Sequence, residues 1–171
     1  MNSTPVISVH DVKLVPRPEA WLPRGAAADK FECQRAFVGE PLGLKKIGCN
    51  VTQVAPGRTA YPFHSHRAND ELFYILSGHG ELRLGQVRHP VKEGDLIGCP
   101  VGGSETAHQL INTGNEPLRY LAISSQFDPD ICEYPDSGKI GTYCNGHDGD
   151  PKTGLMHLSK YSSHVDYWDG E

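Results

Sequence analysis

Residues 57–78 carry the sequence GRTAYPFHSHRANDELFYILSG, and this stretch decides how the chain folds. His64 and His66 are two positions apart, so on a strand both imidazole rings would project from the same face. Glu71 follows after a four-residue turn and opens an apolar strand. If that strand pairs with the strand of the two histidines, the Glu71 carboxylate faces both rings.

The sequence around this stretch alternates short β-rich segments with glycine and proline turns. Between residues 44 and 125 the predicted strands are Lys45–Val54, Glu71–Leu76, Glu81–Leu84, Gln86–Val91, Asp95–Cys99, His108–Asn112 and Leu118–Ser124. The Ser77–Gly80 segment predicts a tight hairpin between two of them. Seven or so strands at a spacing of roughly ten residues are typical of an all-β sandwich or barrel.

A third histidine, His108, begins a later predicted strand. Three neutral imidazoles and one carboxylate are borderline donors, which suit a divalent first-row metal such as Zn, Fe, Mn or Ni. Four protein ligands can close a tetrahedral zinc site, or they can leave two positions of an octahedron open for water, dioxygen or a chelating substrate. The sequence does not choose between these two geometries. We predict that His64, His66, Glu71 and His108 bind one divalent metal ion.

Two stretches in this region resemble the two sequence motifs of the cupin superfamily. The first is Gly57-x6-His64-x-His66-x4-Glu71-x6-Gly78, and the second is Gly94-x5-Pro100-x-Gly102 followed by His108-x3-Asn112. Residues 103–107 make the loop before His108 longer than is usual in the family. The resemblance implies a double-stranded β-helix, or jelly-roll, barrel that holds its metal inside the mouth and commonly forms a homodimer.

The segments on either side of residues 44–125 lack this regular alternation. Residues 1–43 contain five prolines and are predicted to pack on the barrel as an extension or to add an edge strand. Ala26–Cys33 is expected to form one or two helical turns. Residues 126–171 are polar and are predicted to form a loop-rich extension. The expected organisation is therefore a barrel core, 44–125, with irregular N-terminal and C-terminal extensions.

The composition is that of a globular protein and argues against several kinds of partner. The chain has 16 Lys and Arg against 21 Asp and Glu, and its basic residues are scattered, so we expect no nucleic-acid partner. No stretch approaches the roughly 18 apolar residues that span a bilayer, and Met1–Arg17 has no signal-peptide pattern. We therefore expect no membrane partner and a cytoplasmic location, with the five cysteines reduced.

The barrel alone does not define a reaction, because many activities share the fold. We expect a metalloenzyme that acts on a small-molecule substrate, and two reaction types stay open. One is Fe(II) dioxygenase-like. The other is sugar-phosphate isomerase- or epimerase-like, which needs a general base and cations for the phosphate. Arg58 and Arg67 are the nearest cations in sequence, and no catalytic residue is assigned. The alternative function is a non-catalytic module that binds a small ligand.

Overall fold

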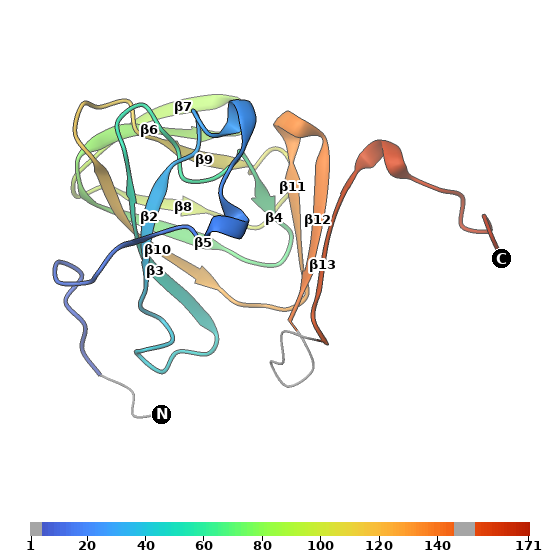
Figure 1. The fold of residues 1–171 in the computed structure, drawn as a ribbon, viewed down its shortest axis with the longest axis horizontal. Coiled ribbons are helices and arrows are strands. Elements are labelled where there is room, and N and C mark those ends of the chain that lie inside the picture. The colour runs from blue at the N-terminus through green and yellow to red at the C-terminus, as the bar shows by residue number, and fades with distance from the viewer. Residues whose placement is uncertain (1–4, 146–152) are drawn as a thin grey trace.

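The computed structural model describes residues 5–145 and 153–171, and its long elements are all strands (Figure 1). The strands form sheets of six, four and three members, and every strand pair is antiparallel. The named helical elements in the described residues are short 3-10 turns. The predicted all-β class is therefore confirmed. No helix among the described residues is long and apolar enough to cross a bilayer.

The six-stranded sheet forms one wall of the barrel. Its order is β1 (Val15–Pro16), β2 (Cys33–Phe37), β3 (Ile47–Val54), β10 (Leu118–Ser125), β5 (Glu71–Ser77) and β8 (Leu96–Cys99). The first two strands come from the N-terminal segment, so the predicted edge strand is present. Of the helical turns predicted for Ala26–Cys33, the structure has only the 3-10 turn Gly25–Ala27 at the start of the segment, and Cys33 already begins β2.

The three-stranded sheet forms the facing wall. Its order is β7 (Val87–Lys92), β6 (His79–Leu84) and β9 (His108–Ile111). Because β5 and β6 belong to different sheets, the hairpin predicted at Ser77–Gly80 is wrong. Gly78 turns the chain from one wall to the other with a φ of 85°, and a Cβ there would lie 2.6 Å from the carbonyl oxygen of Pro117. The sequence thus predicts the turn at Gly78 correctly. A turn pattern alone does not show whether the strands before and after it pair with each other.

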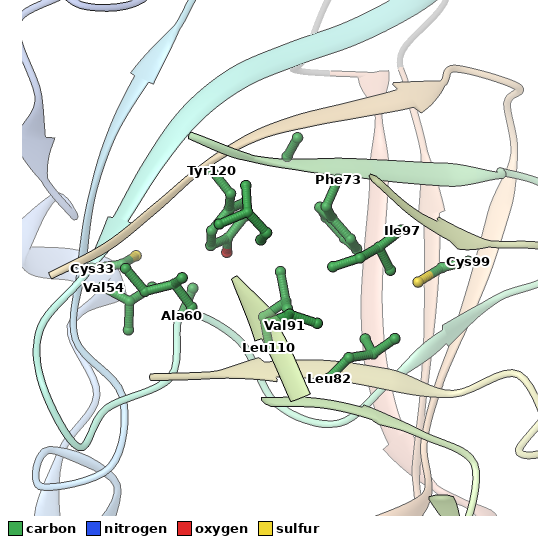
Figure 2. Close-up of a cluster of buried hydrophobic side chains, with 13 residues drawn as sticks. Cys33, Val54, Ala60, Phe73, Leu82, Val91, Ile97, Cys99, Leu110 and Tyr120 are labelled. Carbon is green, nitrogen blue, oxygen red and sulfur yellow. The ribbon is translucent and has the colours of Figure 1, made fainter. Parts of the chain in front are cut away.

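Apolar side chains from both walls meet in one core (Figure 2). On β5, Phe73 and Ile75 are 7% and 0% exposed, whereas Tyr74 between them is 40% exposed. This period of two is the pattern of a strand with one buried face. Val91 and Leu110 contribute to the core from the opposite wall. Full burial of such a side chain stabilises the fold by about 1.5–3 kcal/mol, so the packing of this core stabilises the barrel.

The four-stranded sheet lies beside the barrel and was not predicted (Figure 1). Its order is β13 (Leu155–Lys160), β12 (Lys139–Cys144), β11 (Asp130–Tyr134) and β4 (Ser65–His66). The loop-rich extension expected in residues 126–171 instead supplies three strands. The sequence gives little sign of β11, because it buries the carboxylates of Asp130 and Glu133, each residue 8% exposed. β13 has no buried face, since all its residues except the half-buried Ser159 are exposed.

The partner of the histidine strand also differs from the expectation. β4 pairs with β11, whereas the Glu71 strand β5 pairs with β10 and β8. The direct pairing considered for these two strands therefore does not occur, although both still reach the same end of the barrel. The division into a core, 44–125, with two extensions stays a prediction, and so does the homodimer.

Arg83 ties the barrel to the C-terminal sheet. Its guanidinium carbon lies 3.6 Å from the centroid of the Phe63 ring, and its nitrogens donate to both carboxylate oxygens of Asp136 at 2.7 and 2.9 Å. Asp136 belongs to the 3-10 turn Pro135–Ser137 between β11 and β12. The hydrogen bonds from Arg83 hold the pKa of the Asp136 carboxyl below its ordinary value.

We predict that Asp136→Asn lowers the free energy of unfolding by about 0.5–1 kcal/mol near pH 7, a small effect because water screens this half-exposed pair. The folded pKa is depressed, so the stabilisation is present above the ordinary Asp pKa and is lost as the pH falls through the folded value. Urea unfolding of both proteins near pH 7 and near pH 2 measures it. The two stabilities should converge in acid, and a difference that persists there contradicts the assignment.

Candidate metal centre

The four residues predicted to bind metal lie together at one end of the barrel. His66 is on β4, with His64 just before it, while Glu71 begins β5 and His108 begins β9. His64 and His108 form an isolated antiparallel bridge, in which each backbone N–H donates to the carbonyl oxygen of the other, at 3.2 and 2.8 Å. Their ring centroids are 4.8 Å apart. The backbone therefore fixes the spacing of these two rings.

The Nε2 atoms of the three histidines face one oxygen of Glu71. Glu71 Oε2 lies 2.7 Å from Nε2 of His108, 3.6 Å from Nε2 of His66 and 3.9 Å from Nε2 of His64. The side chains are largely buried, with 4% of His108 and 18% of Glu71 exposed. His64, His66 and Glu71 form a candidate metal-binding group whose ligand atoms lie within 4.8 Å of one another. His108 joins this group through its hydrogen bond to Glu71.

The opposite nitrogen of each ring faces an oxygen acceptor. Nδ1 lies 2.8 Å from the Pro62 carbonyl oxygen in His64, 2.6 Å from Asp130 Oδ2 in His66 and 3.3 Å from the Thr106 carbonyl oxygen in His108. These acceptors place the proton of a neutral ring on Nδ1 and leave the Nε2 lone pair directed at the centre. Nε2 of His66 is buried without a hydrogen-bond partner, which is costly in the absence of an ion. The donor set thus fits a divalent metal ion.

Burial and mutual interaction shift the pKa values of these groups in different directions. Burial lowers the pKa of His64 to about 4, assisted by the nearby His108, so this ring is neutral at ordinary pH. Burial opposes ionisation of Glu71, but the hydrogen bond from His108 and the neighbouring imidazoles lower its pKa to about 2. Burial likewise disfavours the charged form of His108, yet Cys99 and Glu71 raise its pKa to about 10. These opposite shifts favour a charged hydrogen bond between Glu71 and His108.

Two cavities open beside the centre, and His66 and Glu71 line both of them. The inner cavity has a volume of about 210 Å³ and is lined by Tyr61, Phe73 and Tyr120 within the barrel. The outer cavity, of about 420 Å³, lies between the barrel and the C-terminal sheet. It is lined by the carboxylates of Glu71, Asp128 and Asp130 as well as by Asn69 and Tyr143. The centre therefore has space for a small molecule on two sides.

The sequence reasoning missed the residues that β11 adds behind the histidines. Besides Asp130, Cys132 places its Sγ 3.3 Å from Nδ1 of His66, and the Tyr134 ring stacks on His64 at 6.1 Å between centroids. His66, Asp130 and Cys132 form a second group with possible ligand atoms. The alternation of these three β11 residues at a period of two was the pattern that would have placed them on one face of a strand.

The two cations considered for phosphate binding are engaged elsewhere. The Arg67 Nε donates to Glu133 at 2.6 Å, and Arg58 lies 3.8 Å from Glu32. Each guanidinium thus already has a carboxylate partner.

Comparison with known proteins identifies one domain of the chain. Residues 50–124 match the family model described as a cupin domain. Over 68 residues the chain is 34% identical to the oxalate-binding protein of Thermotoga maritima. These aligned residues cover 40% of this chain and 54% of that protein. The chain spans between 50% and 57% of the length of the curated relatives that it matches.

Two crystal structures share the fold over most of the chain. A proposed sugar phosphate isomerase of Acidithiobacillus ferrooxidans is 27% identical and has a TM-score of 0.67, with 79% of this chain and 80% of that chain covered. A sugar phosphate isomerase of Silicibacter pomeroyi has a TM-score of 0.72 with 96% and 98% covered, but at 19% identity it shows the fold alone. The family match, the two motifs and the barrel together show that residues 50–124 of the chain form a cupin domain.

Proposed function

We propose that the chain binds one divalent metal ion through His64, His66, Glu71 and His108 and acts on a small molecule as a metalloenzyme. The observation that carries this proposal is the orientation of the three rings, since every Nδ1 faces an oxygen acceptor and every Nε2 faces Glu71 Oε2. Once His108 has lost its extra proton, three lone pairs and one anionic oxygen are directed at one point. His66 Nε2 would obtain there the partner that it lacks.

We place the substrate in the inner cavity, next to the three Nε2 atoms. Its aromatic lining, Tyr61, Phe73 and Tyr120, offers apolar contacts, while Asn50 and Gln109 add amide groups that can orient a polar ligand. A volume of about 210 Å³ suits a small molecule rather than a polymer. When bound, a divalent ion would supply Lewis acidity at this point, and iron would also supply the redox chemistry that a reaction with dioxygen needs.

Of the two reaction types, the isomerase- or epimerase-like one has the better support. The Acidithiobacillus ferrooxidans protein, which is 27% identical, is a proposed sugar phosphate isomerase. The outer cavity is lined by three carboxylates, which would repel a phosphate group on that side. We therefore propose that the substrate is an uncharged sugar or a related carbonyl compound rather than a sugar phosphate. A dioxygenase-like reaction is the second type and requires iron.

The non-catalytic alternative uses the same residues. The Thermotoga maritima relative is named for binding oxalate. A module of this kind would hold a small chelating ligand at the metal ion without converting it.

Metal analysis tests the site itself. We predict that the purified or reconstituted chain retains about one divalent ion and that the double variant His64→Ala, His66→Ala retains almost none, because two of the four ligands are gone. The matched control replaces His89 and His157, both exposed, with alanine and should keep the ion. Circular dichroism should show that all three proteins remain β-structured, since the apolar core is untouched. Full metal content in the double variant would overturn the proposal.

Turnover by the metal-loaded protein tests the reaction. We predict that the Zn or Mn form exchanges a carbon-bound hydrogen of an uncharged aldose or ketose for deuterium in D2O, as NMR detects, because proton abstraction next to a carbonyl needs the Lewis acid. In the Glu71→Gln variant, metal affinity should fall at least about 100-fold, a larger loss than is typical for a residue outside the ligand set. The variant should therefore also fail to catalyse the exchange of hydrogen for deuterium. Oxygen uptake by the iron form without such exchange would favour the dioxygenase instead. Calorimetric binding of oxalate with neither activity would establish the binding module.

A further inference from the structure

Asp130 of β11 contacts the candidate metal centre from outside both cupin motifs. Its Oδ2 lies 2.6 Å from Nδ1 of His66, and its Oδ1 accepts the backbone N–H of Ala68 at 3.0 Å. The residue is 8% exposed, so water does not compete effectively for either oxygen. Both oxygens of one buried carboxylate are thus committed to the segment that carries His66.

The register of the C-terminal sheet fixes this contact. Cys132 is the cross-strand partner of His66 and Glu133 that of Ser65, so β11 is hydrogen-bonded along the histidine strand itself. Asp130 precedes Cys132 by two positions and therefore shares its face of the strand. The strand pairing, rather than a flexible loop, brings the carboxylate to the imidazole.

We propose that Asp130 is a positioning residue that holds the proton of His66 on Nδ1 and so presents the Nε2 lone pair to the metal ion. This inference rests on the metal site proposed above. It assigns the C-terminal sheet a part in that site, as the element that sets the tautomer and the orientation of one ligand. A carboxylate accepts but does not donate, which makes it selective for the Nδ1–H form of the ring.

Cys132 shows what the ring would meet without Asp130. The Cys132 Sγ lies 3.3 Å from Nδ1 of His66, and a thiol can donate a weak hydrogen bond to an unprotonated Nδ1. The ring proton would then lie on Nε2, the atom that faces Glu71 Oε2 at 3.6 Å. That tautomer has no lone pair at the centre and cannot bind a metal ion there.

Asp130→Asn is the informative substitution because it changes the acceptors and leaves the shape. An asparagine side chain has one oxygen, whereas Ala68 N–H and His66 Nδ1–H are two donors. If the amide nitrogen faces His66, it stabilises the wrong tautomer; if it faces Ala68, two donors oppose each other. We therefore expect the zinc dissociation constant to rise by about 10- to 100-fold, the usual range for a carboxylate behind a ligand histidine.

The experiment measures zinc affinity by chelator competition in the wild type, Asp130→Asn and Asp136→Asn. Asp136→Asn is the matched control, because it also removes a carboxylate that anchors the C-terminal sheet but contacts Arg83 instead of a histidine. In parallel, two-bond ¹H–¹⁵N NMR of the metal-free wild type reports the tautomer of His66 directly. We expect the Nδ1–H form in the wild type, weaker zinc binding by Asp130→Asn and unchanged binding by Asp136→Asn.

Each other outcome overturns a defined part of the argument. Equal zinc affinity in the wild type and in Asp130→Asn, or equal loss in both variants, would refute the role of Asp130 while leaving the metal site intact. An Nε2–H tautomer in the metal-free wild type would refute it as well, whether or not the variant folds. If the wild type binds no zinc, manganese or iron, the proposed function itself fails, and this inference fails with it.

Discussion

An ionised Glu71 carboxylate inside the protein is the constraint on which the rest of the site depends. Removing a carboxylate from water costs several kcal/mol unless charged or hydrogen-bonding partners replace the lost hydration. Here the direct partners are His66, from the segment before β5, and His108, at the start of β9. A third part of the chain, β11, contributes indirectly, because its Asp130 is hydrogen-bonded to His66. The two walls of the barrel and the C-terminal sheet must all be in place before this carboxylate is compensated.

Much of the barrel and the candidate ligand set could be predicted from the sequence. Seven strands followed from alternation and turn residues, because a strand with one face in the core repeats every two residues. The proximity of His64 and His66 to Glu71 followed from the same periodicity, and the position of His108 from the second motif. The structure brings all four side chains together. Their role as metal ligands stays a prediction.

The errors have physical causes in contacts between distant residues and in the burial of polar side chains. At Gly78 the chain turns as predicted, but whether the next strand pairs with β5 or crosses to the facing wall depends on contacts distant in sequence, such as that with Pro117. β11 was missed because it buries Asp130 and Glu133, and hydrophobic periodicity detects only strands that bury apolar side chains. Polar burial is itself informative, since buried carboxylates need specific partners and are commonly found at functional sites.

The bridge between His64 and His108 joins residues that are 44 positions apart in the chain. Closing a loop of this length costs an unfolded polypeptide on the order of 3 kcal/mol of entropy. Of the four proposed ligands, only His64, His66 and Glu71 are therefore close together in an unfolded chain. His108 joins them when the barrel closes. With the proposed ligand set, the complete site would therefore exist only in the closed barrel.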